Sequence, residues 1–213
     1  RQWRAELARS ESLRPTTATM SDAEIMAALG HPGVPPEGRF YPDTYAFSKG
    51  SADLAVMRRA LRAMQSRLDA AWAERSPDTP LRSADDALVL ASIVEKETGA
   101  AGERGRIAGV FVNRLRQGMP LQTDPTVIYG LGAAFDGNLR KRDLQADTPY
   151  NTYLRAGLPP TPISMPGKAS LLAAVRPDPT RALYFVARGD GSSEFSDTLA
   201  EHNRAVNRYQ RGR

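Results

Sequence analysis

The chain has 213 residues, of which 41% are hydrophobic and 25% are charged, and its formal net charge is +5 at pH 7. This composition is typical of a folded globular domain and excludes an intrinsically disordered chain. Because the sequence contains no cysteine, disulfides, thiolate metal sites and cysteine nucleophiles are excluded as well.

Helical patterns dominate the first part of the chain. The first 14 residues are predicted to be the tail of a helix. Ser21, with Glu24 three residues later, predicts a short capped helix. Leucine and methionine recur at helical spacing between residues 52 and 75, which predicts a longer one. The stretch between them, EGRFYPDTYAF at residues 37–47, is rich in aromatic residues and could wall a groove or plug the underside of a loop.

The helix predicted from Asp85 to Thr98 is apolar nearly all round between Ala87 and Val94, so we expect other elements to enclose it. This apolar run ends in Glu95-Lys96-Glu97. At the helical turn angle the two glutamates lie about 200° apart, so they cannot both point into one cleft. One could be a working carboxylate, and the other would then be a structural partner of Lys96, an arginine or backbone groups.

Two interpretations of this helix end remain open at this point. In the first, a buried helix simply ends in a polar last turn. In the second, apolar surroundings raise the pKa of one carboxylic acid, which can then donate a proton near neutral pH.

The second half of the chain alternates helices with long connections. A helix is predicted to end at Gly118, and residues 119–166 are predicted to be rich in loops. A short helix closed by Pro177, a hairpin over residues 182–196 and a final helix from Thr198 complete the chain. The expected fold class is therefore α+β and helix-dominant, with a helical core, one β-hairpin and long ordered loops.

The long loop region holds polar side chains next to tyrosines, a mixture that suits sugar rings. These residues could instead be Asx and proline turns that tie the loops down. Long ordered loops inside a compact domain are usually functional. The candidate binding residues are Gln122, Thr123, Asp124, Tyr150 and Asn151, with Tyr129 and Tyr153 as further flat surfaces.

Several kinds of site have no sequence signature. His31 and His202 have no partner at motif spacing, so neither a metal nor a cofactor is expected. Basic residues do not gather with aromatic ones, so no nucleic-acid partner is expected. No apolar run approaches the roughly 20 residues that cross a bilayer, and any anchoring segment is expected upstream of this chain.

Four segments together resemble the YceG-like family of endolytic murein transglycosylases. They are EGRFYPDTY, ASIVEKET, NRLRQGMPLQTDPTVIYGLG and the long run that begins YNTYLRAGLPP. The resemblance extends from about Glu37 to Asn207. It implies that residues 1–20 are a tail leading out of a missing LysM-like subdomain, and that residues 21–213 are the catalytic domain.

The resemblance also implies an activity. The family cleaves nascent peptidoglycan glycan strands between N-acetylmuramic acid and N-acetylglucosamine, and it leaves a 1,6-anhydro end. The catalytic glutamate lies in the segment matching ASIVEKET and is carried over to Glu95, with Glu97 as the lesser candidate. By position, Tyr150 and Asn151 would hold the substrate, with Gln122, Thr123 and Asp124 on the facing loop.

The implied setting is the bacterial cell envelope. The chain would be the periplasmic catalytic domain of a single-pass inner-membrane protein, with peptidoglycan glycan strands as substrate and peptidoglycan synthesis enzymes as further partners. Two other functions remain open. The first is a hydrolase of the same polymer, with Glu95 as acid and Asp124 or Asp43 as base. The second is a peptidoglycan-binding scaffold without catalysis.

Overall fold

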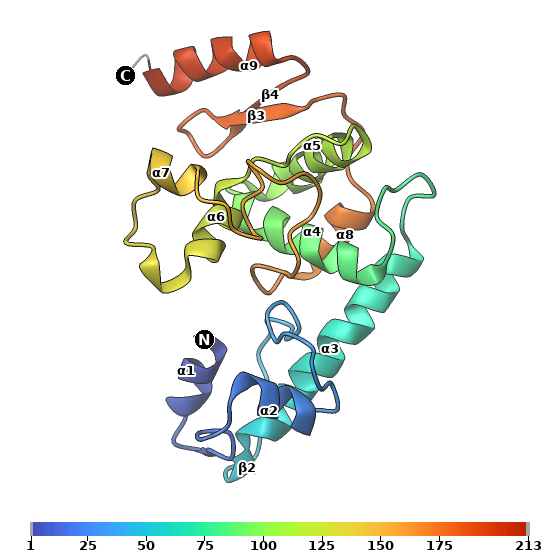
Figure 1. Ribbon diagram of the computed structural model, residues 1–213. Helices are drawn as coiled ribbons and strands as arrows, with labels where there is room; N and C mark the ends of the chain where they lie inside the picture. The colour runs from blue at the N-terminus through green and yellow to red at the C-terminus, as the bar shows by residue number, and fades with distance from the viewer. Residues whose placement is uncertain (1, 212–213) are drawn as a thin grey trace.

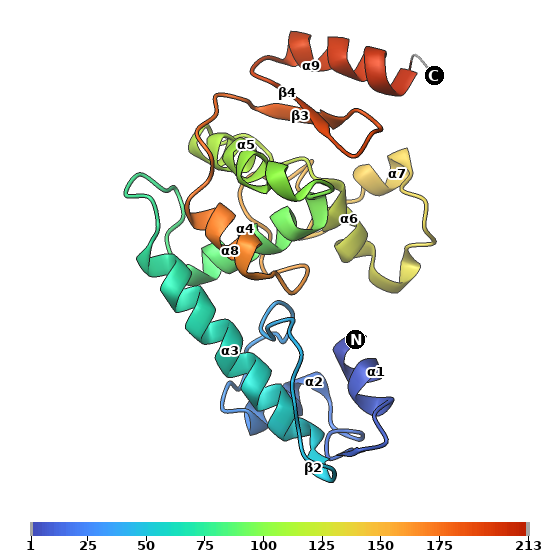
Figure 2. The same ribbon diagram turned by 180° about the vertical axis from the view of Figure 1, so that it is seen from behind.

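Helices dominate the computed structural model, which describes residues 2–211 (Figure 1). The longest described helix, α3 (Asp53–Ala73), connects a smaller N-terminal part to a larger C-terminal part (Figures 1 and 2). Two small sheets accompany the helices, one parallel and one antiparallel. Their strands are β1 (Leu13–Arg14) with β2 (Ser51–Ala52), and β3 (Tyr184–Ala187) with β4 (Ser193–Ser196). The predicted helix-dominant α+β class is confirmed.

In the N-terminal part, α1 (Gln2–Ala8) and α2 (Asp22–Ala28) lie beside the first half of α3 (Figure 1). The short helix predicted after Ser21 is confirmed, because the Ser21 hydroxyl accepts from the Glu24 amide and the Glu24 carboxylate accepts from the Ser21 amide. The first helix is shorter than predicted and ends at Ala8, before the chain enters β1. The buried core of this part is Ile25, Met26, Leu29, Phe40, Met57, Ala60 and Leu61.

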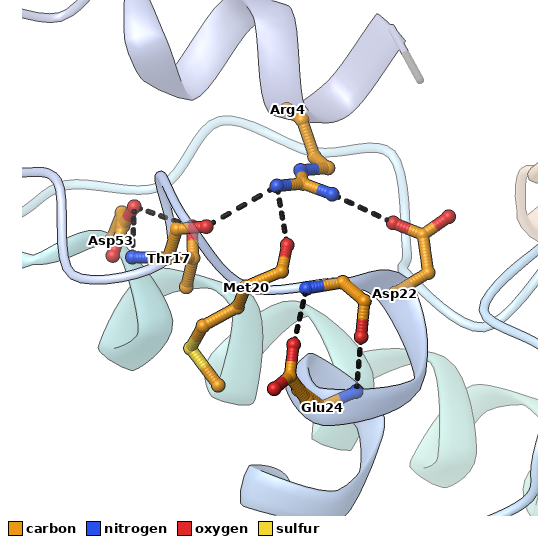
Figure 3. A network of polar contacts seen from close by, with 7 residues as sticks. Arg4, Thr17, Met20, Asp22, Glu24 and Asp53 are labelled. Atoms are coloured by element: carbon orange, nitrogen blue, oxygen red, sulfur yellow. Dashed lines mark hydrogen bonds and ion pairs between the residues drawn. The ribbon is translucent and has the colours of Figure 1, made fainter.

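Polar contacts fasten the N-terminal segment to this core (Figure 3). The Arg4 guanidinium donates to the Asp22 carboxylate at 2.9 Å and to the Met20 carbonyl at 2.8 Å. In the first turn of α3, the buried Asp53 accepts a hydrogen bond from the Thr17 hydroxyl at 2.6 Å. The start of the described chain is therefore an integral part of the N-terminal fold.

The C-terminal part is built around α4 (Ala84–Glu97), which packs against α5 (Arg104–Arg116), α8 (Lys168–Val175) and the end of α3. Every residue of α4 from Ala87 to Val94 is buried, which confirms the predicted enclosure of this helix. Each fully buried leucine or isoleucine contributes about 1.5–3 kcal/mol. The one polar residue of this run, Ser92, uses its hydroxyl oxygen to accept from the Ile163 amide at 3.0 Å.

Helix α3 contributes to both cores. Met57, Ala60 and Leu61 belong to the N-terminal core, whereas Met64 and Leu68 belong to the core around α4. The two cores therefore lie on consecutive turns of one continuous helix.

The aromatic stretch at residues 37–47 lies where the two parts meet. Phe40 is buried in the N-terminal core and Tyr41 in the core around α4, so both rings serve packing and neither walls an open groove. Gly38 has a φ of +78°, and a Cβ there would stand 2.4 Å from the Cβ of Pro162. This close approach joins the N-terminal part to the long loop that precedes α8.

The predicted hairpin and the helix after it are confirmed. Strands β3 and β4 pair with Tyr184 opposite Ser196, and the Phe185 ring meets the Phe111 ring of α5 edge-on at 5.9 Å. Helix α9 (Leu199–Val206) follows with Thr198 as its N-cap. It continues into η3 (Asn207–Arg211), and Figure 1 shows α9 on the side of the hairpin away from α5.

Residues 119–166 contain more helix than predicted. Helix α6 (Asp124–Leu131) and the short α7 (Lys141–Leu144) interrupt this segment. The loop prediction was therefore wrong at α6, where Thr123 is the N-cap and a proline stands in the first turn, an ordinary helix start. Two further elements, η1 (Ala101–Glu103) and η2 (Gly132–Ala134), are short 3₁₀ helices. Within residues 2–211, no helix combines the length and the apolar character needed to span a membrane.

Candidate active site

The two glutamates at the end of α4 enter different surroundings, as the helix geometry predicts. Glu95 accepts hydrogen bonds from the Gly167 amide at 3.1 Å and from the Ser170 hydroxyl at 2.6 Å. Glu97 accepts a short hydrogen bond from the Thr123 hydroxyl, in the segment that leads into α6. One carboxylate therefore faces α8 and the other faces α6.

Glu95 serves the N-terminus of α8. The N-cap of this helix is Gly167, which has no side chain that could cap the free amide groups of the first turn. The Glu95 carboxylate supplies this function from α4 and also binds Ser170, which is fully buried. A carboxylate is favourable at this end of a helix because the helix dipole is positive there. Both contacts tie the Glu95 carboxylate to the start of α8.

The surroundings of Glu97 shift its pKa. Burial raises the pKa of Glu97 above its ordinary value, the hydrogen bond from Thr123 opposes this rise, and the nearby carboxylate of Asp124 adds to it. A carboxylic acid whose pKa is raised by burial can remain protonated closer to neutral pH, as general acid catalysis requires. The physical argument made from the sequence for one buried acid therefore applies to Glu97.

Thr123, the hydrogen-bond partner of Glu97, is held in place by two other buried threonines. The Thr123 amide donates to the Thr152 hydroxyl oxygen at 3.1 Å, and the Thr126 hydroxyl donates to the Thr123 carbonyl at 2.8 Å. The hydroxyls of Thr126 and Thr152 lie 2.8 Å apart. All three residues are at most 2% exposed. We call Thr123, Thr126 and Thr152 the threonine cluster.

Asp124 and Tyr153 form a second polar pair beside Glu97. The Tyr153 hydroxyl donates to the Asp124 carboxylate at 2.6 Å. Burial and this hydrogen bond raise the pKa of Tyr153, which therefore stays protonated. The sequence identified Tyr153 only as one of three flat rings, whereas the structure shows its hydroxyl bound to the candidate binding residue Asp124.

The remaining predicted site residues differ in their exposure. Gln122 is exposed, and its backbone adopts a φ of 53°. Tyr150 is partly buried, its ring packs 4.8 Å from that of Tyr129, and its hydroxyl lies 2.7 Å from the Thr161 hydroxyl. These contacts tie Tyr150 to its neighbours, whereas Gln122 is exposed and its side-chain oxygen accepts from the Arg114 guanidinium at 3.2 Å.

Asn151 does not line an open surface. The residue is fully buried, and its side-chain amide donates to the carbonyls of Leu144 and Ala146 at 3.0 and 2.8 Å. Its side-chain oxygen accepts from the Tyr153 amide at 3.0 Å. The geometry thus does not support the predicted contact between Asn151 and substrate, because the hydrogen-bonding groups of this side chain serve the turn that carries Tyr153.

The other groups considered from the sequence lie elsewhere. Asp43, one of two candidate bases, forms an ion pair with Arg67 at 3.5 Å. Neither the hollow of about 410 Å³ beside α9 nor the larger one of about 640 Å³ between α5 and residues 177–181 includes a glutamate of α4, so the candidate site is defined by its carboxylate chemistry and not by cavity size. Across residues 2–211, no three histidine, aspartate or glutamate side chains gather in a way that could hold a metal ion.

The fold and the site together define a class of protein: a helical domain that presents a partly buried carboxyl group beside hydroxyl groups at the end of its central helix, an arrangement that suits general acid–base chemistry. The sequence model of the YceG-like family matches residues 1–208. This chain belongs to the YceG-like family, and the resemblance identified from its motifs is confirmed.

Individual relatives agree with the family match. The chain is 40% identical to the endolytic murein transglycosylase of Bacillus subtilis over 176 residues, which cover 82% of this chain and 48% of that protein. It is 30% identical over 175 residues to the endolytic murein transglycosylase of Streptococcus pneumoniae, covering 80% of this chain and 31% of that protein. The chain thus spans about half or less of the length of these curated relatives.

A solved structure supports the fold. The crystal structure of a yceG-like protein from Listeria monocytogenes superposes on this chain with a TM-score of 0.70 and 33% sequence identity. The superposition covers 95% of this chain and 62% of the Listeria protein.

Proposed function

We propose that this chain is the catalytic part of an endolytic murein transglycosylase. Support comes from its family, from its 40% identity to the Bacillus subtilis relative of that name, and from the site at the end of α4. The reaction would cleave the bond between N-acetylmuramic acid and N-acetylglucosamine in nascent glycan strands and leave a 1,6-anhydro end. The observation that carries this proposal is one carboxylic acid, Glu97, whose pKa is raised by burial.

We assign the catalytic acid to Glu97, and this replaces the sequence-based preference for Glu95. Both residues lie in the segment ASIVEKET, so the family resemblance accommodates either of them. Glu95 already serves the Gly167 amide and the Ser170 hydroxyl, which makes it a structural carboxylate. Glu97 is next to the polar loop that was expected to bind sugars, because its partner is the Thr123 hydroxyl.

A single carboxyl group is sufficient for this reaction. Glu97 first protonates the departing glycosidic oxygen, and the substrate's own N-acetyl group meets the positive charge that develops on the muramic sugar. The resulting carboxylate then accepts the proton of the sugar 6-hydroxyl as that oxygen bonds to the anomeric carbon, and the enzyme returns to its starting state. Because the nucleophile is tethered to the reacting sugar, the entropic cost of bringing it into position is largely avoided.

The residues around Glu97 have distinct roles in this proposal. The Thr123 hydroxyl donates to one carboxyl oxygen of Glu97. This hydrogen bond stabilises the carboxylate that Glu97 becomes after it has protonated the glycosidic oxygen. The exposed Gln122 and Asp124, and the ring of Tyr153, contact the sugars. Tyr150 and Asn151 support this surface from behind, through Thr161 and through the Tyr153 amide.

The proposed place of action is the bacterial cell envelope, on peptidoglycan glycan strands. In the full-length protein, the domain would lie on the periplasmic side of the inner membrane, anchored by a segment outside this chain. Residues 1–20 would lead out of a LysM-like subdomain, and enzymes of peptidoglycan synthesis would be the protein partners. These statements extend the family resemblance and stay predictions.

Digestion of purified uncrosslinked glycan strands tests the proposal. A transglycosylase produces 1,6-anhydro ends, and mass spectrometry distinguishes these from the reducing ends of a hydrolase by the mass of one water. A hydrolase would need a second carboxylate, and Asp124 beside Glu97 is the candidate for that base. If glycan binds without any fragment being released, the protein is a scaffold and the proposed activity is wrong.

A further inference from the structure

Arg114 in α5 is a buried arginine that binds backbone instead of an acid. The residue is 6% exposed, and its guanidinium donates to the Leu183 carbonyl at 2.7 Å and to the carbonyls of Pro120 and Leu121 at 3.0 Å each. It also donates to the side-chain oxygen of Gln122 at 3.2 Å. Burying a charge is costly unless it is well hydrogen-bonded, and three of these four bonds go to the segment 120–122.

This segment contains a strained residue. Gln122 has a φ of 53°, and within residues 2–211 no other residue except glycine has a positive φ. Such a backbone conformation persists in a residue other than glycine only when surrounding contacts hold it. Arg114 binds both preceding carbonyls and the Gln122 side chain, while the Gln122 amide donates to the Thr152 carbonyl at 3.0 Å.

The backbone conformation of Gln122 determines where the next residue lies relative to the candidate acid, Glu97. The next residue is Thr123, whose hydroxyl donates to Glu97. If Gln122 relaxed to a negative φ, the chain would leave in another direction and Thr123 would turn away from Glu97. We propose that Arg114 is a positioning residue that holds the Gln122 turn and thereby keeps the Thr123 hydroxyl against the Glu97 carboxyl group.

Asn113 provides a control that distinguishes a positioning role of Arg114 from a purely structural role. It precedes Arg114 in α5, and its side-chain amide donates to the carbonyls of Thr180 and Ala182 at 2.9 and 3.1 Å. Arg114 also supports this region, through the Leu183 carbonyl and through its position 5.0 Å from the centre of the Tyr184 ring. Asn113 makes no hydrogen bond to residues 120–122 among the described contacts, so Asn113→Ala is a matched control for lost support of the hairpin.

The experiment compares Arg114→Lys with Asn113→Ala in two measurements. The first is an NMR titration of the Glu97 side-chain carboxyl, assigned by its disappearance in Glu97→Gln. The second is the pH profile of glycan cleavage per folded molecule. Lysine keeps the charge but cannot reproduce the planar fork that reaches several acceptors at once.

Arg114→Lys is expected to raise the titration midpoint of Glu97, because the hydrogen bond that favours the carboxylate is lost. It is also expected to lower turnover by about tenfold to a hundredfold, since small displacements in a catalytic site have effects of that size. The alkaline limb of the pH profile should move to higher pH. Asn113→Ala should lower the melting temperature and leave both the midpoint and the alkaline limb unchanged.

Two results would overturn the inference. One is an Arg114→Lys protein that folds and keeps the wild-type Glu97 midpoint. The other is an Asn113→Ala protein that shifts the midpoint as much as Arg114→Lys does. If Arg114→Lys does not fold, Gln122→Val replaces it, because a β-branched residue strongly disfavours a positive φ and valine also removes the side-chain acceptor of Arg114. An unchanged midpoint in Gln122→Val then overturns the inference, and a raised midpoint supports it.

The inference about turnover depends on the proposed role of Glu97, but the NMR titration does not. If the wild-type protein releases no glycan fragments, the proposed function fails, and the midpoints still decide whether Arg114 positions Thr123.

Discussion

Two regions flank the end of α4, and each receives one glutamate. On one side, Glu95 meets the first turn of α8, where an amide and a hydroxyl hold its carboxylate in a fixed place. On the other side, Glu97 meets the threonine cluster, where burial raises its pKa and one hydroxyl binds it. The comparison indicates that residues of the same type, two positions apart in one helix, differ in their surroundings because different elements pack against them.

Glu97→Gln is the strongest test of this difference. Glutamine keeps the shape of the side chain but cannot donate and recover a proton. A positioned acid–base group contributes typically about 10²–10⁴-fold, and one residue performs both steps here, so turnover should fall by at least the upper end of that range. Release of anhydro fragments, measured by mass spectrometry, checks this, and normal release by a folded Glu97→Gln protein would refute the assignment.

Asn151→Ala tests whether the surface beside Glu97 depends on the buried turn behind it. The substitution removes three hydrogen bonds made by a fully buried side chain, which should cost about 1–3 kcal/mol of the free energy of unfolding. Denaturant unfolding measures this loss. A fall in turnover with an unchanged free energy of unfolding would instead support direct contact between Asn151 and the substrate.

Thr123→Val removes the hydroxyl that binds Glu97 and keeps the shape of the side chain. Loss of a hydrogen bond to a charged group should lower turnover about tenfold, and the pKa of Glu97 should rise because its carboxylate loses a donor. The pH profile of turnover measures both effects. Thr126→Val is the control, since it removes a hydroxyl from the same cluster without touching Glu97 in the described hydrogen bonds. Equal effects of the two substitutions would contradict a specific role for Thr123.

Glu95→Gln should act mainly on stability. It weakens the carboxylate cap of α8, and loss of a helix cap costs about 0.5–2 kcal/mol. Turnover per folded molecule should remain within a few-fold of the wild-type value. If Glu95→Gln is folded but inactive while Glu97→Gln still releases anhydro ends, the roles of the two regions are reversed.

The smallest expected effect is a dependence of stability on pH. Because the pKa of Glu97 is raised in the folded state above its ordinary value of 4.5, the folded protein binds this proton more tightly than the unfolded chain. The contribution is fully present below the unfolded pKa and is lost as pH rises through the folded pKa. Relative to the wild type, Glu97→Gln should therefore gain stability over this pH range, as measured by unfolding at several pH values. A constant difference between the two proteins would contradict the raised pKa.

The sequence predicted much of this region, and its failures have physical reasons. Helical spacing was sufficient to show that α4 is enclosed and that its two glutamates diverge. Spacing cannot tell which side faces the substrate, because that depends on α6 and α8, which are distant in sequence. Helix α6 was missed although Thr-Asp-Pro marks its start, since three β-branched residues follow directly and a glycine comes soon after them, and these residues have low helix propensity. Sequence alone also does not distinguish an amide that faces solvent from one that is buried in a turn, as Asn151 is.

Helix α3 has a consequence for how the molecule unfolds. Its 21 residues form a rod of about 32 Å, at 1.5 Å per residue, and consecutive turns of that rod carry Leu61 of one core and Met64 of the other. Because this one helix carries residues of both cores, we expect the two parts to unfold in one cooperative transition. Amide hydrogens on both sides of this junction should therefore exchange with deuterium at similar rates, as members of a single foldon.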